Sequence, residues 1–332
     1  MLRANAADEL KAGLMRFVAA EAERSGARAV DPGHRVPFKW PPHAVSHDFK
    51  VREDQWTERA EFVLHHEAVE VEVAKTEHGV FGRSPKFWAE ARGRDLEEMV
   101  EALAAALEPL FSRQECIARC LGRPGRFDGR IADLEALDLL KLLYCRNRDV
   151  GREAQTIIET GHERQVLMPS LIAILEDRLH PYRRAAQWAV LDLFEDLPSF
   201  CADAEDETAA VRAMKGLLWD AQDDFCRTVY KAGVVLGGQV PTPSGGDALL
   251  ESLHAPSRIG RRSAIHGLFH VVEWQPERRA EVVEALRAAA QREPEPLLQA
   301  FAAQMAEDIA EARYDHTEEP TFDEESPAVG VS

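Results

Sequence analysis

The sequence holds few cysteines and few aromatic residues, has a deficit of basic charge, and contains no long apolar run. Its five cysteines are an odd number at wide spacing in a chain of 332 residues, which argues against the disulfide framework of a small secreted domain. No window approaches the roughly 20 apolar residues of a membrane span, and residues 1–26 lack the unbroken apolar core of a secretion signal. These absences predict a soluble, cytoplasmic protein without a membrane partner.

The shortage of basic residues argues against partners that are bound through phosphate groups. The chain has 40 Lys and Arg residues against 58 Asp and Glu residues, which gives a formal net charge of −18. Nucleic-acid affinity depends largely on Lys and Arg that neutralise phosphates, so we expect no nucleic-acid partner. Residues 313–332 are acidic and poor in apolar anchors. We expect them to form a disordered tail that either keeps the protein soluble or docks a basic partner.

The segment 1–48 predicts a helix followed by a proline-rich stretch. Residues 7–24 place apolar side chains at helical spacing, namely Leu10, Leu14, Phe17 and Val18. Between residues 26 and 47 four prolines exclude regular structure, and Phe38 and Trp40 lie among them. This stretch is predicted to cross the body as a buried strap, and a docking peptide is the alternative.

Residues 59–92 carry the pattern of a small β-sheet. The stretch 68–75 alternates valine with glutamate, a period of two, and shorter apolar runs around it predict three further strands. Asp95 can N-cap the helix that follows, and Glu98 three residues later completes a variant of the capping box. The unit is therefore predicted to be a β-meander whose apolar face is covered by one helix.

The junction between this sheet and its helix resembles a known fold. Strands that end in a glycine are followed by an amphipathic helix whose start reads Gly93, Asp95, Leu96, Glu97 and Glu98. This arrangement, over about residues 59–111, resembles the HicB-like α/β fold of antitoxins. The resemblance implies a small α/β module and, as one function, a regulator of the toxin–antitoxin type.

The stretch from His180 to Leu197 predicts an amphipathic helix with Trp188, Leu191 and Phe194 on one stripe. Such a helix cannot bury its stripe alone, so related helices are expected elsewhere in the chain. Similar helix starts recur around Arg152, Arg183, Arg227 and Arg261. Second helices are predicted between them, over 165–176, 207–219, 247–253 and 277–291. Paired helices at a period of roughly 30 to 45 residues predict an α-solenoid, in which neighbouring units bury a continuous core.

The repeated unit, a turn acid or proline, an arginine and then small residues, resembles HEAT repeats and the related repeats of bilin lyases over about residues 134–312. In such a stack the four arginines are expected to fix the register, because each can bond the turn acid or a carbonyl group of the adjacent unit. Substrate contact is the alternative for them. Arg258 and Arg262, next to Arg261, complete a local basic cluster and are a candidate interaction surface.

Histidine pairs are the candidate metal ligands. His266 and His270, at i and i+4 on one helical face, suit a single metal ion, but solvated or core histidines have the same spacing. The pairs His66–Glu67 and His162–Glu163 are similar to the His-Glu motifs of deoxyhypusine hydroxylases, which are HEAT-repeat iron enzymes. They do not recur at equivalent repeat positions. We expect no cofactor and assign no catalytic residue.

Cysteines and glycines give weaker signals. Cys116 and Cys120 share a helix face and are predicted to be buried free thiols, with nothing nearby that lowers a thiol pKa. Gly237–Gly238 and Gly245–Gly246 flank two prolines and are predicted to mark a long loop. The sequence contains no phosphate-cradling glycine-rich loop and no nucleophile elbow.

Taken together, these patterns predict a mostly α-helical fold: a helix and strap over 1–48, a small HicB-like α/β domain over 49–122, a HEAT-like α-solenoid over 123–312 and an acidic tail over 313–332. The predicted function is a protein–protein interaction scaffold or regulatory adaptor, without catalysis, that binds another protein through the solenoid surface. Two alternatives stay open. One is a HEAT-like enzyme or enzyme subunit, bilin-lyase-like or metal-dependent, and the other is a HicB-like toxin–antitoxin regulator.

Overall fold

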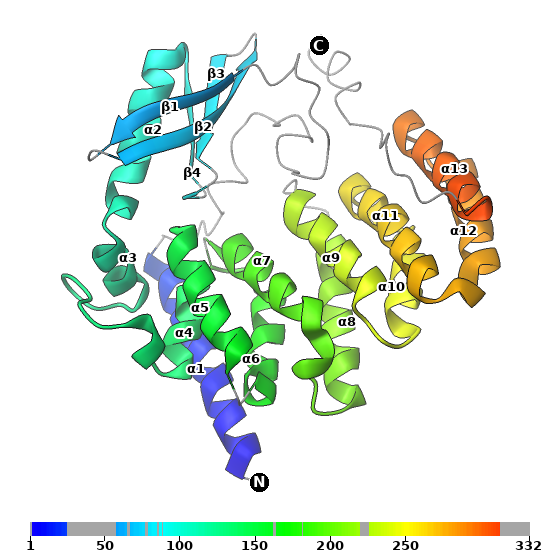
Figure 1. The fold of residues 1–332 in the computed structure, drawn as a ribbon, viewed down its shortest axis with the longest axis horizontal. Helices are drawn as coiled ribbons and strands as arrows, with labels where there is room; N and C mark the ends of the chain where they lie inside the picture. The colour runs from blue at the N-terminus through cyan, green and yellow to red at the C-terminus, as the bar shows by residue number, and fades with distance from the viewer. Residues whose placement is uncertain are drawn as a thin grey trace. The chain divides into compact units, whose positions relative to one another are not determined.

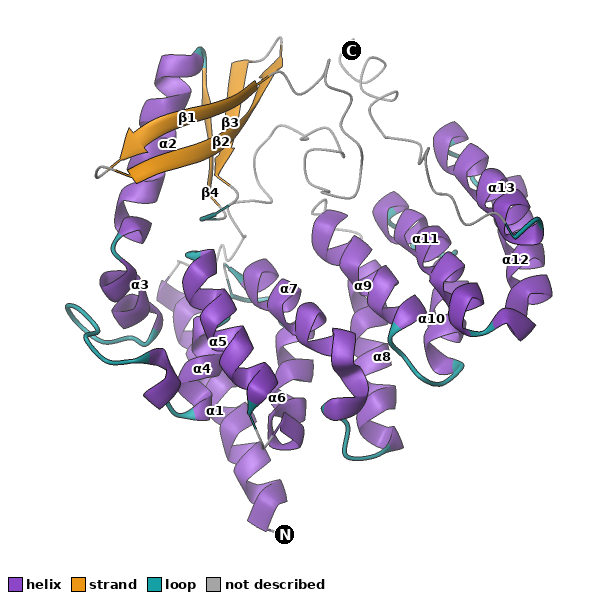
Figure 2. Ribbon diagram, viewed as in Figure 1, coloured by secondary structure: helices purple, strands orange, loops and turns teal. Residues whose placement is uncertain are grey.

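The computed structural model describes residues 2–24, 58–64, 67–76, 79–84, 86–87, 89–161, 164–180, 182–219 and 226–312. These residues form a mostly helical protein with a small antiparallel sheet (Figure 1, Figure 2). The strap predicted over 26–47 and the predicted acidic tail lie outside them. None of the described helices combines the length and the apolar character that crossing a membrane requires.

The described residues divide into two compact units, one ending at Val190 and the other beginning at Leu191. The division falls inside helix α7 (Arg183–Leu193). The domain boundaries predicted after residues 48, 122 and 312 are a different partition of the chain, and they stay predictions.

Four strands of the first unit form one antiparallel sheet in the order β1-β2-β3-β4. Their bounds are Glu58–Leu64 (β1), Glu67–Thr76 (β2), Gly79–Ser84 (β3) and Ala89–Gly93 (β4). The alternation predicted for β2 is present, because Val69, Val71 and Val73 are buried whereas Glu70 is exposed. The predicted β-meander is confirmed.

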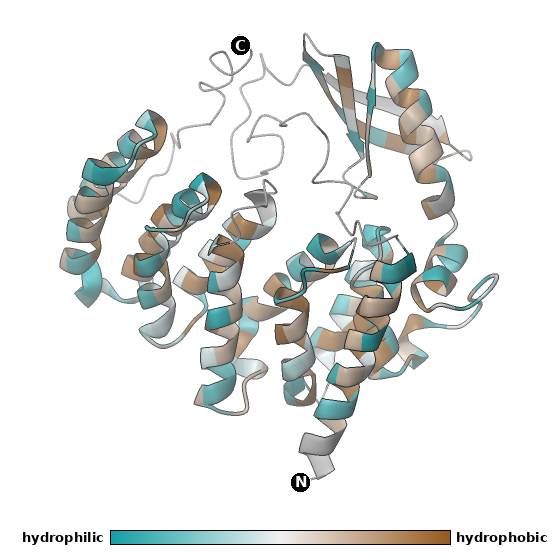
Figure 3. Cartoon of the chain, turned by 180° about the vertical axis from the view of Figure 1, so that it is seen from behind, coloured by the Kyte–Doolittle hydropathy of each residue, from teal (hydrophilic) through white to brown (hydrophobic). Residues whose placement is uncertain are grey.

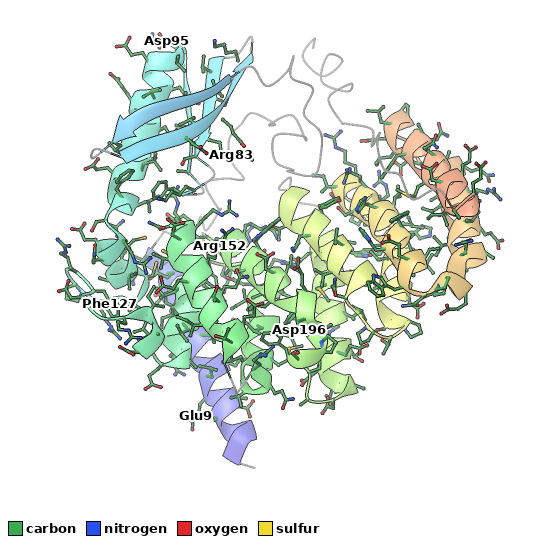
Figure 4. All side chains as sticks on the ribbon, in the orientation of Figure 1. Glu9, Arg83, Asp95, Phe127, Arg152 and Asp196 are labelled. Atoms are coloured by element: carbon green, nitrogen blue, oxygen red, sulfur yellow. The ribbon has the colours of Figure 1, made fainter. Side chains whose placement is uncertain are left out.

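Helix α2 (Leu96–Phe111) covers one face of this sheet by packing on β3 and β4 (Figure 1). The Asp95 carboxylate caps the helix by accepting a hydrogen bond from the backbone N–H of Glu98 at 2.9 Å, as predicted (Figure 4). The Glu98 carboxylate accepts from the backbone N–H of Arg94 at 2.9 Å. In the usual capping box this carboxylate accepts from the backbone N–H of the capping residue itself, which is Asp95 here. In this helix it accepts instead from Arg94, the residue before the cap.

Helix α1 contributes apolar side chains to the core of the first unit. Leu14 and Val18 of α1 are buried, in agreement with the predicted apolar face, and α1 packs against α4 and α6. The bounds in this unit are Leu2–Arg24 (α1), Arg113–Cys120 (α3), Ile131–Asp133 (η3), Ala136–Leu142 (α4), Arg148–Thr160 (α5) and Arg164–Leu175 (α6).

The turn between α6 and α7 holds a buried polar cluster. The Asp177 carboxylate accepts hydrogen bonds from the backbone N–H groups of Leu179 at 2.7 Å and His180 at 3.1 Å. Nδ1 of His180 accepts from the backbone N–H of Tyr182 at 3.0 Å, and the imidazole ring lies 4.2 Å from the ring of Tyr144. Burial, aided by the charge of Arg183, lowers the pKa of His180 to about 3. A neutral imidazole therefore shapes this turn.

The helix predicted over 180–197 is shorter than expected. Helix α7 ends at Leu193, and a 3₁₀ segment (η4, Phe194–Ser199) follows. Asp196 has φ −116° and ψ 48°, outside the helical region, and Pro198 has no N–H to continue the ladder. Leu191 and Phe194 of the predicted stripe are nevertheless buried.

Helices of the second unit pack in two interleaved series. Helices α9, α11 and α13 follow one another with α9 against α11 and α11 against α13, while α8 packs against α10 (Figure 1). Apolar and polar residues both occur along these helices (Figure 3), as expected of helices that bury one side. The bounds are Ala204–Trp219 (α8), Cys226–Gly238 (α9), Ser244–Ser252 (α10), Arg258–Trp274 (α11), Pro276–Arg278 (η5), Arg279–Arg292 (α12) and Pro296–Ala310 (α13).

The glycines predicted to mark a long loop lie within helices instead. Gly237 and Gly238 end α9, and Gly245 and Gly246 lie in the first turn of α10. The reason is close backbone contact: a Cβ on Gly237 would lie 2.1 Å from the carbonyl oxygen of Gly267 in α11. Glycine is required there because any side chain would overlap the neighbouring backbone.

Candidate functional site

Side-chain contacts in the second unit recur at a nearly constant distance along the chain. Long-range ion pairs and hydrogen bonds join residues 31 to 39 positions apart, about the length of one helix pair with its turns. Examples are Arg278–Asp247, Arg261–Glu293, Trp219–Ser252, Thr242–Glu207, Tyr230–His266, Lys215–Glu251 and Lys231–Glu195. These contacts join helices that are two elements apart in the chain, such as α8 to α10 and α9 to α11.

Arg261 makes the most complete of these contacts. Its Nε and Nη2 atoms donate to the two carboxylate oxygens of Glu293, each at 2.8 Å, and Nη1 donates to the carbonyl oxygens of Ala255 at 3.0 Å and Pro256 at 3.1 Å. The pair is largely buried, with side-chain exposures of 15% for Arg261 and 6% for Glu293. This geometry suits an arginine that fixes the register of neighbouring helices, the role predicted for it.

The other three predicted register arginines have different surroundings. Arg152 is exposed on α5 (Figure 4). Arg183 begins α7, and its buried Nε and Nη1 atoms have no hydrogen-bond partner among the described residues. The side chain of Arg227 lies outside the described part of the chain. Their predicted equivalence to Arg261 stays a prediction.

The basic cluster predicted beside Arg261 is split between surface and interior. Arg258 is half-buried and lies 3.6 Å from Glu295. Arg262 is only 2% exposed, and its guanidinium lies over the rings of Tyr230 at 5.1 Å and Phe301 at 5.6 Å. Arg262 thus lies inside the helical layer rather than on an interaction surface, because it stacks on two aromatic rings.

The histidine pair on α11 belongs to a hydrogen-bonded chain. Nε2 of His266 lies 2.7 Å from the hydroxyl of Tyr230 and 3.2 Å from Nε2 of His270, and Nδ1 of His270 lies 2.7 Å from a carboxylate oxygen of Glu273. Glu273 reaches only His270, and no third His, Cys, Asp or Glu among the described residues brings a ligand atom close to both histidines at once. The metal role of His266 and His270 stays a prediction.

Trp274, the last residue of α11, is the most exposed large apolar side chain among the described residues, at 70%. Two side chains bond the turn that carries it to the residues before α10: Gln275 Nε2 donates to the carbonyl oxygen of Thr242 at 3.4 Å, and Arg278 Nη1 donates to that of Pro243 at 3.0 Å. The indole is thus presented to solvent from an ordered turn. Tryptophan is enriched among the residues that anchor protein interfaces.

A surface groove of about 860 Å³ begins just after Trp274, at Pro276, and runs along α12. Apolar Pro276, Ala280 and Val283 line it together with charged residues of both signs, Glu277, Arg279, Glu284 and Arg287, and with Ala288, Gln291 and Ala310. A groove of this composition suits a segment of polypeptide better than a small apolar molecule.

Three cysteines of the first unit lie close together, at a place where the sequence predicted no site. Cys145, in the turn between α4 and α5, brings its sulfur to 3.2 Å from that of Cys116, and the sulfurs of Cys116, Cys120 and Cys145 all lie within 4.8 Å of one another. Hydrogen bonds from the thiols of Cys120 and Cys145 and the charge of Arg119 lower the pKa of Cys116 to about 3, whereas the pKa values of the other two thiols are raised. The expectation that nothing nearby lowers a thiol pKa is therefore wrong.

Sequence reasoning found two of the three cysteines and missed the third. Cys116 and Cys120 were recognisable from their helical spacing, but nothing in the sequence places Cys145, which follows a different helix, beside them. The side chains of His66 and Glu67, and the pair His162–Glu163, lie outside the described part of the chain.

Comparison with known proteins adds no relative. No family model, no curated protein and no solved structure matches the chain.

Proposed function

We propose that the protein is a non-catalytic scaffold or adaptor that binds another protein through a HEAT-like stack of helix pairs. The observation that carries this proposal is the recurrence of side-chain contacts at separations of 31 to 39 residues in the second unit. A stack of helix pairs offers an extended surface to which another protein can bind. The proposed module at 49–122 is HicB-like, which the β-meander covered by α2 supports.

The proposed binding surface comprises Trp274 and the adjoining groove along α12. Trp274 supplies a large apolar contact whose supporting turn is already ordered, so binding it costs little conformational entropy. The groove adds carboxylates and guanidiniums, which give specificity more than affinity. The partner is therefore expected to be a protein segment that buries the indole and places charges of both signs against Glu284 and Arg287.

The test is quantitative affinity purification of the full-length protein from its own cells. Wild type would be compared with Trp274→Ser and with Trp219→Ser, a matched control at the end of α8. Trp219 is 39% exposed, and its Nε1 donates to Ser252 Oγ at 3.1 Å. A partner protein present at about one copy per chain is expected with wild type and Trp219→Ser. The Trp274→Ser variant is expected to lose it, since removing a tryptophan anchor typically costs about 2 kcal/mol or more.

Two results would count against the proposal. A monomer that recovers no stoichiometric protein from its own cells would contradict the scaffold function. A partner retained equally by Trp274→Ser and wild type would contradict the binding surface assigned to Trp274. Circular dichroism of each variant separates a lost contact from a lost fold. Turnover of a small molecule by the purified protein would favour the HEAT-like enzyme, and co-purification of a small basic toxin would favour the HicB-like regulator.

A further inference from the structure

The cysteine cluster of the first unit is built from two elements that meet at one point. Helix α3 (Arg113–Cys120) carries Cys116 and Cys120 one turn apart, so both sulfurs lie on the same face. Cys145 lies in the turn that follows α4, and its backbone N–H donates to the carbonyl oxygen of Leu142 at 3.0 Å. Two ligand positions on a helix and a third on a tight turn form a compact donor set.

The turn that carries Cys145 is fixed on its far side. The side chain of Asn147 caps α5 by accepting from the backbone N–H of Asp149 at 3.1 Å, and its Nδ2 donates to the carbonyl oxygen of Leu110 at 3.3 Å. Asn147 thereby ties the turn to the end of α2, immediately before α3. The position of Cys145 relative to α3 is thus set by the backbone around it and does not depend on a bond between the sulfurs.

The sulfur positions match the requirements of a single thiophilic ion. An ion with bonds of about 2.3 Å to sulfur holds tetrahedral sulfur ligands about 3.8 Å apart. The sulfurs of Cys116 and Cys145 lie 3.2 Å apart, and the greatest separation in the cluster is below 4.8 Å. Shifts of roughly 1 Å or less would equalise these distances, whereas a disulfide between Cys116 and Cys145 requires about 2.05 Å and leaves Cys120 unused.

The burial of the three thiols differs in a way that suits metal entry. Cys116 and Cys145 are 3% and 2% exposed, whereas Cys120 is only partly buried at the end of α3. We expect an ion to enter from the side of Cys120, the least buried of the three residues, and three thiolate ligands leave one tetrahedral position open. No His, Asp or Glu among the described residues joins this donor set. Thiolate ligands without hard oxygen donors select Zn²⁺ or another soft ion over Mg²⁺ and Ca²⁺.

We propose that Cys116, Cys120 and Cys145 bind one Zn²⁺ ion as thiolates, with a fourth position left for water or an external ligand. The bond formed at each sulfur replaces its S–H bond, and the released protons pass to solvent. The ion joins α3 to the α4–α5 turn across the loop of residues 121–135. This site is independent of the proposed protein-binding surface, which lies in the other unit.

The test begins with wild-type protein purified under reducing conditions without chelator. We expect about one Zn²⁺ per chain by elemental analysis, and exchange for Co²⁺ should give the absorption bands of thiolate-bound tetrahedral cobalt. Zn²⁺ should also slow alkylation of Cys116, Cys120 and Cys145, mapped by mass spectrometry, while Cys201 is alkylated at the same rate with or without the metal. This comparison needs no variant and so does not depend on a mutant that folds.

Variants then assign the ligands. Cys120→Ser, at the least buried position, should weaken Zn²⁺ binding by more than about 100-fold in a competition with a chromogenic chelator. Cys201→Ser, at a cysteine outside the cluster, should leave the affinity unchanged. Unchanged alkylation rates in the presence of Zn²⁺, or a Cys120→Ser variant that binds Zn²⁺ like wild type, would overturn the proposal. So would a Cys116–Cys145 disulfide in protein that takes up no metal.

Discussion

The α6–α7 turn of the first unit and the α9–α11 contact of the second hold helices in place by opposite means. At the turn, buried polar groups around His180 bond to specific backbone atoms. At the contact, Gly237 and Gly267 let two helix backbones touch. The stability of the polar cluster depends on the protonation state of its side chains. The backbone contact depends only on the absence of side chains at its glycines.

Of the four predictions, the largest effect on stability is expected from low pH, because the polar cluster contains a titratable histidine. The pKa of His180 is lowered from 6.5 to about 3 in the folded protein, so protonation favours the unfolded chain. Stability from this group is complete above about pH 6.5 and is lost as the pH falls toward 3, by up to an amount on the order of 4 kcal/mol. Denaturant melts between pH 3.5 and 7, which follow the free energy of unfolding, measure this loss.

Variant pairs isolate the His180 effect. His180→Asn keeps an acceptor for the Tyr182 N–H and removes the titration, so its stability should vary less with pH than that of wild type. The difference between the two curves excludes Asp177, whose pKa is raised by burial and whose effect has the opposite sign. His254→Asn, at an exposed position, is the matched control. Parallel curves for wild type and His180→Asn would refute the assignment.

The second prediction breaks the glycine contact. A Cβ on Gly237 would lie 2.1 Å from the Gly267 carbonyl oxygen, a backbone atom that cannot move freely. Gly237→Ala is therefore expected to destabilise the second unit by about 3 kcal/mol in urea unfolding. Gly238→Ala is the control at the adjacent position: its nearest atoms would be 3.7 and 3.9 Å distant. Equal stability of the two variants would show that α9 and α11 do not meet at Gly237.

A third prediction sharpens the repeat interpretation. Arg261→Ala removes both bonds to the buried Glu293 carboxylate and is expected to cost about 2 kcal/mol, with the double variant Arg261→Ala/Glu293→Ala costing less than the sum. The pair Arg258–Glu295, at 3.6 Å and about 30% exposed on both sides, should show a coupling of less than about 0.5 kcal/mol. Similar coupling energies in the two double-mutant cycles would show that the Arg261–Glu293 pair contributes no more than an exposed pair, and Arg261 would then not fix the register of these helices.

The smallest effect concerns a local signal in the first unit. Asp95→Ala removes the cap of α2 and is expected to cost about 1 kcal/mol in thermal or urea unfolding. Asp95→Asn retains an acceptor for the Glu98 N–H and should lie close to wild type. A cost for Asn as large as that for Ala would mean that the charge at this helix end matters more than the hydrogen bond.

Features of the fold that depend on neighbouring residues were predictable from the sequence, and features that depend on contacts between distant residues were not. The Asp95 cap and the alternating valines of β2 are local signals, so the strands and α2 were predictable to near their observed bounds. The burial of Arg262 depends on Tyr230 and Phe301 from other helices, and the position of Cys145 depends on a separate turn. Gly237 looked like a loop residue because its function, contact with Gly267, is set by the next helix of its series. Residues that act through such distant contacts carry no local pattern.

The most direct test of protein binding through Trp274 is photo-crosslinking within the protein's own cells. Benzoylphenylalanine would replace Trp274 in one experiment and Trp219 in another, in the full-length chain. We expect one abundant protein adduct at position 274 and at most background at position 219, because Trp274 is 70% exposed and Trp219 only 39%. Equal yields at both positions, or no protein adduct at 274, would contradict a scaffold that binds its partner through Trp274.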